Sequence, residues 1–550
     1  MLRSVSRFAA LLRAFGRVFG NRNVRNIQLA GAGDVLGTYA YGVALPVYAY
    51  HAGGARAVGL LFLARFVFAA LASPWLGVLA DRWSRRRLML GADLLRCGIF
   101  AAMTAVAATA GSAYAVYVLA VSSTIISAAY PPARAALLPS LVESPEELTS
   151  ANLVGNSIAS VGMFVGFALG GILLAVSSPA VVFAVNGATF LLSIAFLLRV
   201  PADSPPERVA HPRFLPELTA GFATVVRWPA LRTVVGLSAA QAMVEGALMV
   251  LVVVLALQVL QSGNAAVGWL NAGMGVGSIV GVGAVAVLAS RRRLAGGFAL
   301  GILLWGFPLA IAAATTTLAP AIILLGLVGM GVMLVETNGM TLLQRSADNE
   351  VLGRVFAVLQ GLIFASMAVG AGIAPALVTW LGPRGALLAA GLFLPVLLVP
   401  TWPALRRIDA EARIAEVPLE LLRRIEIFAQ LPEPIIERLA GTATPVSTAA
   451  GQVVVARGER GDHFYVIAAG RAAVELDDGT FRPLAHGDHF GEIALLRDVP
   501  RTATVRAVEP LRLYAIERDE FIAAVTGHAP TRAAAEKVVM SRLPEGALLG

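Results

Sequence analysis

Apolar runs long enough to cross a lipid bilayer recur along the first three quarters of this sequence. A transmembrane helix needs about 20 consecutive apolar residues. Runs of about this length lie at 26–50, 57–80, 88–109, 114–137, 150–176, 179–199, 231–259, 266–289, 295–315, 318–342, 355–381 and 384–404. The composition agrees, because 57% of the 550 residues are hydrophobic and only 14% are charged. Both an ordinary soluble protein and a disordered chain are excluded.

Arginine is concentrated in alternate loops between these runs. Cytoplasmic loops carry an excess of Lys and Arg. Here Arg residues follow the even-numbered runs, whereas the opposite loops hold only Arg56 and Arg384. We therefore predict a multi-pass protein of the cell membrane with both termini in the cytoplasm. Because the basic residues set membrane orientation, the lipid bilayer is an expected partner and nucleic acid is not.

The apolar runs fall into two groups of six, which a long loop separates. Residues 1–25 alternate Arg with Phe and Leu, which is typical of an amphipathic helix at the membrane interface. Two six-helix bundles are expected at 26–199 and 231–404, as in transporters built from internal repeats. The cytoplasmic central loop, 200–230, is Pro-rich before a short helix. A connector, 405–428, follows the second bundle.

The pattern changes to that of a soluble domain after residue 410. Residues 1–410 hold 27 basic and 14 acidic side chains, whereas 411–550 hold 16 and 20. Short β-branched runs follow, interrupted by Gly, with a hairpin signal at Asp478-Gly479. A final amphipathic helix is expected at 518–543. The predicted fold class is an all-α membrane body of twelve helices, followed by a cytoplasmic α+β domain at 417–543, a β-roll flanked by helices.

The turn between the second and third runs carries a specific motif. It reads GVLADRWSRRR and resembles the signature loop of the major facilitator superfamily. Segments 130–152 and 342–358 resemble the bacterial drug- and siderophore-exporter branch of that superfamily, so that the resemblance covers about residues 20–405. It implies a secondary transporter of a small molecule. Gly77 would let two helices approach closely, and Asp81 could cap a helix or pair with Arg. The expected gate residues are Gly77, Asp81, Arg82 and Arg86; an ordinary positive-inside loop is the alternative.

Few charged side chains lie within the apolar runs. A charge in the membrane costs at least about 2.5 kcal/mol on insertion scales, so each one is a functional candidate. In the family that the chain resembles, runs 1, 4, 7 and 10 line the central cavity, and three of the four carboxylates fall on these runs. The candidates for transport and coupling are Asp34, Arg65, Asp93, Arg96, Glu245 and Glu336.

Depth in the membrane selects the ion pairs that these candidates can form. At about 1.5 Å per residue, Arg96 and Asp34 lie equally deep, about 12 Å from the cytoplasmic side, whereas Arg65 lies about 22 Å deep. We expect Arg96 to pair with Asp34, or with Asp93 at i, i+3 spacing. A pair of Asp93 with Arg96 fits a structural role at least as well as a proton relay. For Asp34 and Glu245 we favour proton coupling.

The most specific string in the chain is FGEIALLRDVPRTATV, residues 490–505. With GERGDHFYVIAAG upstream, it resembles the cyclic nucleotide-binding domain of bacterial regulators, kinases and channels. The resemblance implies that Arg501 holds the phosphate, that Glu492 accepts from the ribose hydroxyl and that Gly491 permits close approach of the backbone. The N-terminus of a short helix offers further N–H groups. The expected contacts are Gly491, Glu492, Ile493, Ala494, Arg501, Thr502 and Ala503.

These patterns together predict a proton-coupled exporter that is regulated by cAMP or cGMP. The alternative is a membrane receptor or scaffold that reports nucleotide binding to a partner without transport. An enzyme finds no support, because the sequence has no Walker A loop, no G-x-S-x-G elbow and no His cluster. Cys97 is the single cysteine, so no metal site is expected. The substrate, the choice between cAMP and cGMP, and a monomer or dimer stay open.

Overall fold

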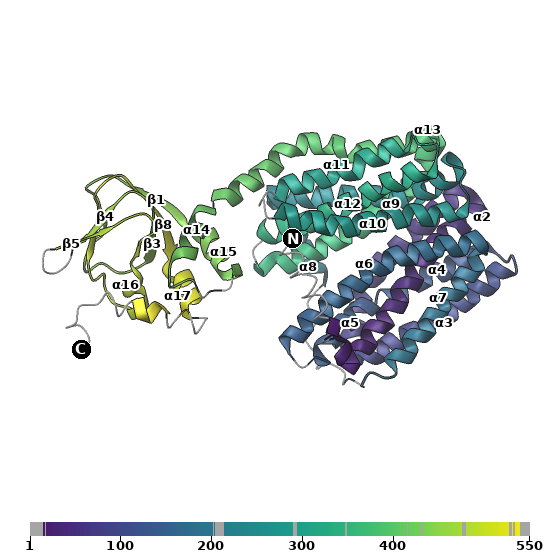
Figure 1. Ribbon diagram of the computed structural model, residues 1–550, viewed down its shortest axis with the longest axis horizontal. Coiled ribbons are helices and arrows are strands. Elements are labelled where there is room, and N and C mark those ends of the chain that lie inside the picture. Colours follow the sequence, from purple (N-terminus) through teal and green to yellow (C-terminus); the bar gives the residue numbers. More distant parts are fainter. Residues whose placement is uncertain are drawn as a thin grey trace. The chain divides into compact units, whose positions relative to one another are not determined.

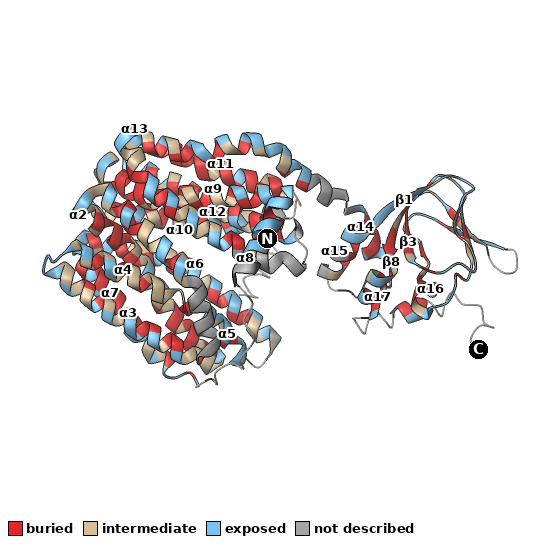
Figure 2. Ribbon diagram, turned by 180° about the vertical axis from the view of Figure 1, so that it is seen from behind, coloured by how far each residue is buried: buried red, intermediate tan, exposed pale blue. Residues whose placement is uncertain are grey.

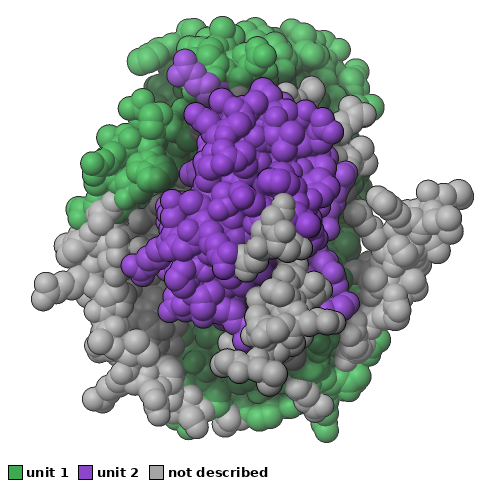
Figure 3. Space-filling view, turned by 90° about the vertical axis from the view of Figure 1, so that its left-hand side faces the viewer, with its two compact units in different colours: residues 1–406 green, residues 407–550 purple. Residues whose placement is uncertain are grey.

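The chain forms two compact units, which are coloured separately in Figure 3. They are Met1–Arg406, here called the helical unit, and Arg407–Gly550, here called the β-roll unit. The computed structural model describes residues 15–538 except 17, 143, 202, 204–213, 290–293, 347–348, 415, 430, 432, 476–479, 527–530 and 532–533. The predicted helix over residues 1–25 lies mostly outside the described residues.

The helical unit is built from long apolar helices (Figure 1). Its first half contains α2 (Arg22–Arg82), α3 (Arg85–Ala108), α4 (Ala113–Ser127), α5 (Tyr130–Leu137), α6 (Pro145–Val176) and α7 (Pro179–Leu197). The short α8 (Phe214–Arg227) precedes the second half, which contains α9 (Pro229–Val254), the π-helical turn η2 (Leu255–Val259), α10 (Asn264–Ala289), α11 (Leu294–Ala312), α12 (Leu318–Ser346) and α13 (Asn349–Ile414).

Ten helices among the described residues are long and apolar enough to span a membrane. Two of them, Arg22–Ala72 and Val358–Ile408, have 51 residues each, which at about 1.5 Å per residue is more than twice the hydrocarbon thickness. Each contains a break at a left-handed glycine, Gly54 with φ 63° and Gly382 with φ 74°. Glycine adopts this conformation without steric cost. With two spans in each of these helices, the unit has the twelve spans that the apolar runs predict.

Helices of the two halves touch where glycines remove the side-chain volume. In the first half α2 packs on α6 and α7, and in the second half α12 packs on α10 and α11. Between the halves α6 packs on α10, where a Cβ on Gly268 would lie 2.3 Å from the Cα of Gly171. Large apolar side chains such as Leu94 and Trp380 are exposed, as expected of helices that face lipid. Figure 2 shows exposed residues along the helices of this unit.

The β-roll unit consists of two antiparallel four-stranded sheets flanked by helices. The strand orders are β1-β8-β3-β6 and β2-β7-β4-β5. The strands are β1 (Thr444–Thr448), β2 (Val453–Val455), β3 (His463–Ala469), β4 (Ala472–Glu475), β5 (Phe481–Leu484), β6 (His489–Phe490), β7 (Thr504–Ala507) and β8 (Leu511–Glu517). The helices are α14 (Glu416–Arg424), α15 (Glu433–Thr442), α16 (Glu492–Arg497) and α17 (Arg518–Thr526).

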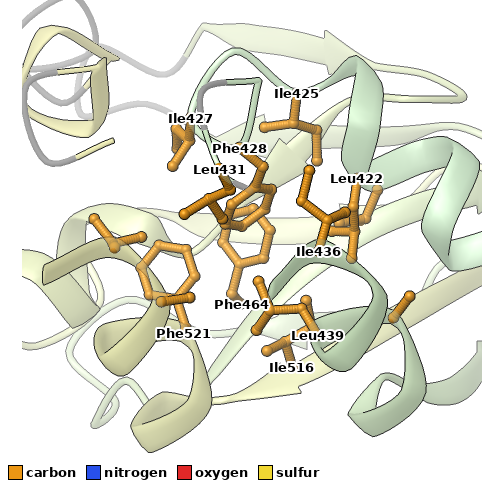
Figure 4. Close-up of a cluster of buried hydrophobic side chains, with 14 of the residues drawn as sticks. Leu422, Ile425, Ile427, Phe428, Leu431, Ile436, Leu439, Phe464, Ile516 and Phe521 are labelled. Atoms are coloured by element: carbon orange, nitrogen blue, oxygen red, sulfur yellow. The ribbon is translucent and has the colours of Figure 1, made fainter. Parts of the chain in front are cut away.

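An aromatic cluster joins the flanking helices to the sheet that contains β3 (Figure 4). The rings of Phe464 on β3 and Phe521 on α17 stack with centroids 4.7 Å apart, and Phe428 meets both edge-on. All three side chains are fully buried. Burial of this apolar surface holds the helices before and after the roll against the same strand.

The final helix and the hairpin can be followed only in part. α17 begins at Arg518 as expected and is described to Thr526, and residues 534–538 are helical. The Asp478-Gly479 signal lies outside the described residues. The strands on either side of it pair antiparallel, with Glu475 opposite Phe481. Within the predicted connector, 405–428, α13 runs on to Ile414 and α14 follows.

Candidate functional site

Arg96 on α3 lies at the centre of a buried ion-pair cluster in the first half. Its Nη1 lies 2.8 Å from Oδ1 of Asp34 on α2, and 3.9 Å from Oδ1 of Asp93 one turn earlier on α3. The guanidinium carbon lies 4.0 Å from the ring centroid of Phe190 on α7, a cation–π contact. The structure thus brings together three of the six predicted intramembrane residues.

The two carboxylates of this cluster differ in their access to solvent. The Asp34 side chain is 20% exposed, whereas that of Asp93 is 0% exposed. Asp93 Oδ2 accepts a 2.6 Å hydrogen bond from the Ser193 hydroxyl on α7. On the other side, the Thr38 hydroxyl accepts from Arg96 Nη2 at 3.3 Å and donates to Asp34 at 3.4 Å. One guanidinium therefore lies between an accessible acceptor and a sealed one.

Arg65 lies outside the cluster. Its Nε donates to the Thr124 hydroxyl on α4 at 2.8 Å, and its guanidinium lies near the rings of Tyr41 and Phe62. No carboxylate of the described residues pairs with it. Its contacts join α2 to α4 within the first half.

Glu245 and Glu336 lie in the second half and interact with each other electrostatically. Glu245 on α9 accepts from Gln241 Nε2 at 3.1 Å. Glu336 lies between the two ends of α12, and its side chain is exposed. Both also interact with Tyr39 on α2, whose ring meets Phe167 of α6 edge-on. Glu245 and Glu336 therefore lie close enough to Tyr39 of the first half for their charges to act on it. Neither glutamate has an ion pair within the described part of the chain.

The gate motif is described only in part. Gly77, Asp81 and Arg82 lie in the last turns of α2, and their side chains lie outside the described residues. Arg86 donates through Nε to the Leu197 carbonyl at 2.9 Å and through Nη2 to that of Leu198 at 3.0 Å. This cation thus binds the carboxyl end of α7, where it opposes the helix dipole.

The sequence did not single out Asp203. This aspartate, in the loop after α7, contacts the first residues of α3. It accepts from the Ser84 hydroxyl at 2.6 Å and from the backbone N–H groups of Arg85 and Arg86 at 2.7 and 3.0 Å. Partial burial raises the pKa of Asp203, but these hydrogen bonds outweigh that effect and hold its pKa below the ordinary value. A lone aspartate in a Pro-rich loop, more than 100 residues from its partners, carries no signal in the sequence.

The predicted nucleotide contacts lie in one segment between β6 and β7. Gly491 precedes α16 with φ 99°, which favours glycine, and a Cβ on it would lie 2.6 Å from Arg501 Nη1. Glu492 and Ala494, at the start of α16, are buried; Ile493 is half-buried. After the turn Thr502 is exposed and Ala503 is half-buried.

Arg501 is held with its guanidinium inside the β-roll unit. Its side chain is 4% exposed. Nη1 donates to the Gly491 carbonyl at 3.1 Å and Nη2 to the His463 carbonyl at 2.8 Å. Nε is buried without a hydrogen-bond partner, so a donor remains for a ligand. Burial lowers the pKa of Arg501, yet guanidinium keeps its charge in proteins.

Asp462, from the string before β3, is a second partner of Arg501. Its Oδ1 lies 3.5 Å from Arg501 Nη2 and 3.1 Å from Nδ1 of His463. Partial burial raises the pKa of Asp462, but His463 and Arg501 outweigh this and hold it below the ordinary value. The sequence motif did not identify Asp462 as a binding residue. A buried cation with a free donor, beside a glycine at φ 99°, fits the phosphate of a cyclic nucleotide.

Comparisons with known proteins match the two units separately. The model of the Major Facilitator Superfamily matches residues 29–365, and that of the cyclic nucleotide-binding domain matches residues 445–528. A cAMP-dependent protein kinase regulatory subunit of Blastocladiella emersonii is 38% identical over 116 residues, 20% of this chain and 27% of that protein. A cGMP-dependent protein kinase of Eimeria tenella is 36% identical over 100 residues, 18% of this chain and 10% of that protein.

Solved structures match over a similar share of the chain. The regulatory domain of Toxoplasma gondii PKA with cAMP has 23% identity and a TM-score of 0.22, and the match covers 24% of this chain and 52% of that one. The sensor domain of the regulator DNR from Pseudomonas aeruginosa has 21% identity and a TM-score of 0.21, with 23% and 94% covered. The chain spans about a quarter or less of the kinase relatives named above.

Proposed function

Because the chain belongs to the Major Facilitator Superfamily and carries a cyclic nucleotide-binding domain, we propose that it is a proton-coupled exporter of a small molecule, regulated by cAMP or cGMP. The observation that carries the proposal is the Arg96 cluster, in which a partly exposed carboxylate shares a buried cation with a sealed one. Placing charged side chains in the membrane costs free energy, and a protein that only anchored a sensor would not need them.

Proton coupling needs a carboxylate that water reaches and whose charge changes its surroundings. Asp34 meets both conditions, since it is partly exposed and pairs with Arg96 at 2.8 Å. Glu245 and Glu336 lie on α9 and α12 of the second half and interact electrostatically with each other and with Tyr39. They are the further candidates for binding a proton or a substrate. Export is supported by the likeness of segments 130–152 and 342–358 to the exporter branch.

Regulation by a cyclic nucleotide is supported by the pocket and by the chain path. The free Nε of Arg501 suits a phosphate oxygen, and the buried Glu492 suits a ribose hydroxyl. α13 runs without interruption from the last predicted span across the boundary of the two units at Arg406. A change in the β-roll unit can reach that span through this helix. The Arg-rich loops favour a cytoplasmic β-roll unit, on the side where cells make cyclic nucleotides.

The substrate is best found without assumptions about its chemistry. Metabolites inside and outside cells are compared between a strain that lacks the protein and one that expresses it, and a compound retained by the deletion strain is then tested in proteoliposomes. Transport should require a proton gradient and should change when cAMP or cGMP is added on the β-roll side. If no compound changes its distribution, the receptor or scaffold without transport is the better account.

A further inference from the structure

We propose that Arg65 on α2 is a binding residue for the transported substrate, and that this substrate carries an oxyanion, either a carboxylate or a phosphate group. The proposal rests on the proposed transport function and narrows the chemical class of the small molecule. It starts from a difference between the two predicted intramembrane arginines of the first half. Arg96 lies between two carboxylates, whereas Arg65 pairs with none among the described residues.

Arg65 lies deep in the membrane-spanning part of α2 and away from its lipid-facing side. At about 1.5 Å per residue, it lies about 22 Å from the cytoplasmic side. The large apolar side chains exposed on this span form one stripe, which consists of Leu60, Val67, Phe68 and Leu71. At about 3.6 residues per turn, Arg65 lies about 120° around the helix from the centre of that stripe. Because Arg65 is half-buried, the accessible part of this cation faces neighbouring helices and not lipid.

The neighbours of Arg65 hold its guanidinium in place without neutralising it. Nε donates to the Thr124 hydroxyl on α4 at 2.8 Å. The guanidinium carbon lies 5.6 Å from the ring centroid of Tyr41 and 5.4 Å from that of Phe62, within the range of cation–π contacts. Nη1 and Nη2 have no hydrogen-bond partner within the described part of the chain. A hydroxyl and two rings thus orient a cation whose charge stays uncompensated.

A second polar group without a partner lies beside this cation. The Tyr41 hydroxyl is buried and makes no hydrogen bond to any described residue. The charge of Arg65 acts on this hydroxyl, more strongly than the charge of Arg96 does. Leaving a buried hydroxyl without a hydrogen bond costs free energy. Both groups can donate, so the group that they lack is an acceptor, and next to a guanidinium a negatively charged one is favoured.

The free donors define the chemistry of this acceptor. With Nε bound to Thr124, the guanidinium presents the N–H groups of Nη1 and Nη2, which lie side by side in one plane. Two oxygens of a carboxylate or a phosphate fit such a fork. A charged side chain inside the membrane pairs with another charge or marks the path of a substrate. Since the described residues offer Arg65 no anion, the substrate supplies it.

The first measurement needs no identified substrate. The full-length protein in lipid nanodiscs is unfolded thermally, at constant ionic strength, with sodium benzoate, phenyl phosphate, benzamide or benzylammonium chloride. A compound that binds only the folded protein raises the unfolding midpoint. Benzoate or phenyl phosphate should raise the wild-type midpoint by a few degrees, whereas uncharged benzamide and the benzylammonium cation should not. The anion that gives the larger shift identifies the group as a carboxylate or a phosphate.

Variants separate anion binding from helix packing. Arg65→Gln should lose the shift that the anions produce. Arg65→Lys keeps the charge without the fork, so it should need severalfold more anion for the same shift, and it serves if Arg65→Gln does not fold. Thr124→Val removes the hydrogen bond that joins α2 to α4 and should lower the midpoint but keep the shift. Arg199→Gln is the matched control and should respond like the wild type, because the exposed Arg199 lies just after α7, 5.5 Å from the Phe196 ring.

The second measurement is transport by the same variants. The metabolite comparison is made with the deletion strain that expresses either the wild type or Arg65→Gln, at equal protein abundance in the membrane. The compound that the wild type exports should carry a carboxylate or a phosphate group. Arg65→Gln should lower its export about tenfold or more, because hydrogen bonds to a charged group are lost.

The outcomes distinguish this proposal from the proposed transport function. If the anions do not shift the wild type, or shift Arg65→Gln equally, Arg65 only packs α2 against α4 and binds no oxyanion. If the exported compound has no oxyanion, or if Arg65→Gln exports it like the wild type, the proposal is wrong although transport stands. If the anions bind through Arg65 but no compound changes its distribution, the transport function fails and Arg65 is the oxyanion site of a receptor.

Discussion

His51 Nε2 lies 2.8 Å from Asn264 Oδ1, and this hydrogen bond joins the two halves of the helical unit. His51 precedes the break in α2, and Asn264 begins α10. Beside it, Gln258 of η2 donates to the hydroxyl of Tyr50. Both bonds lie at the ends of spans that are farthest along the chain from the Arg-rich turns. In the proposed orientation they close the outer face of the transporter.

Removing the His51 bond should open that face. The double variant His51→Ala, Asn264→Ala should increase, severalfold, labelling from outside by a membrane-impermeant maleimide at a cysteine placed at the exposed Thr38. The background is Cys97→Ala, which leaves no other thiol because Cys97 is the single cysteine. Tyr114→Ala, at an exposed tyrosine of α4, is the control and should not change the labelling. Equal labelling in all proteins would show that the bond does not hold the halves.

Gly268→Ala should force the halves apart at the same end. Its Cβ would lie 2.3 Å from a backbone atom of Gly171, which cannot rotate away. Overpacking of this kind costs about 1–3 kcal/mol, so the unfolding midpoint should fall and labelling at Thr38 should rise. Gly283→Ala on the same helix meets nothing within 4 Å and should behave like the wild type. If both variants are equally stable, α6 and α10 do not need this close approach.

Arg501→Ala should abolish tight binding of cyclic nucleotide. A hydrogen bond to a charged group contributes about 1.5–3 kcal/mol, so the Kd for cAMP or cGMP should rise at least tenfold in calorimetric titrations of the full-length protein. Arg506→Ala is the matched control, because its Nη1 donates to the Gly451 carbonyl on the surface of the roll. The assignment of the pocket fails if the two variants bind alike.

Asp203→Asn should destabilise the protein at neutral pH but not in acid. The folded-state pKa of Asp203 is lowered, so its contribution is present above the unfolded-state value of about 3.9 and is lost as the pH falls through the folded-state pKa. We expect a loss of about 1 kcal/mol or less at pH 7, because the site is partly exposed.

The measurement for Asp203 is the unfolding midpoint of wild type and variant between pH 7 and pH 3. Their difference should shrink below about pH 4. Ser84→Ala removes one of the three hydrogen-bond donors to this carboxylate and should give a smaller loss with the same pH dependence. A difference that stays constant down to pH 3 would contradict the role assigned to the ionised carboxylate.

Local patterns in the sequence account for the elements and for part of the site. Apolar run length predicted each span, including the two within α2 and the two within α13, because a span is defined by its own residues and the bilayer. The i, i+3 spacing of Asp93 and Arg96 needs only helical geometry. Equal depth was sufficient to bring Asp34 to Arg96, because helices cross the membrane nearly in parallel.

Contacts between segments far apart in the chain could not be predicted from the sequence. Asp203 meets Ser84 across 119 residues, and His51 meets Asn264 across 213. Polar side chains in loops and at helix ends have no periodicity that marks a partner. Asp462 lay in a string that the motif identified, but its approach to Arg501 depends on the pairing of β3 with β6 and β8.

The sequence by itself determined the two-part architecture, since hydropathy, charge and β-branched runs act through each residue's own preference for lipid, water or strand. Tertiary structure decided which buried charges share a partner and which remain free. It sealed Asp93 with Ser193, left Asp34 open to solvent and held Arg96 between them. The physical reason is that the energy of a buried charge depends on the neighbours that packing supplies, and packing is a property of the whole fold.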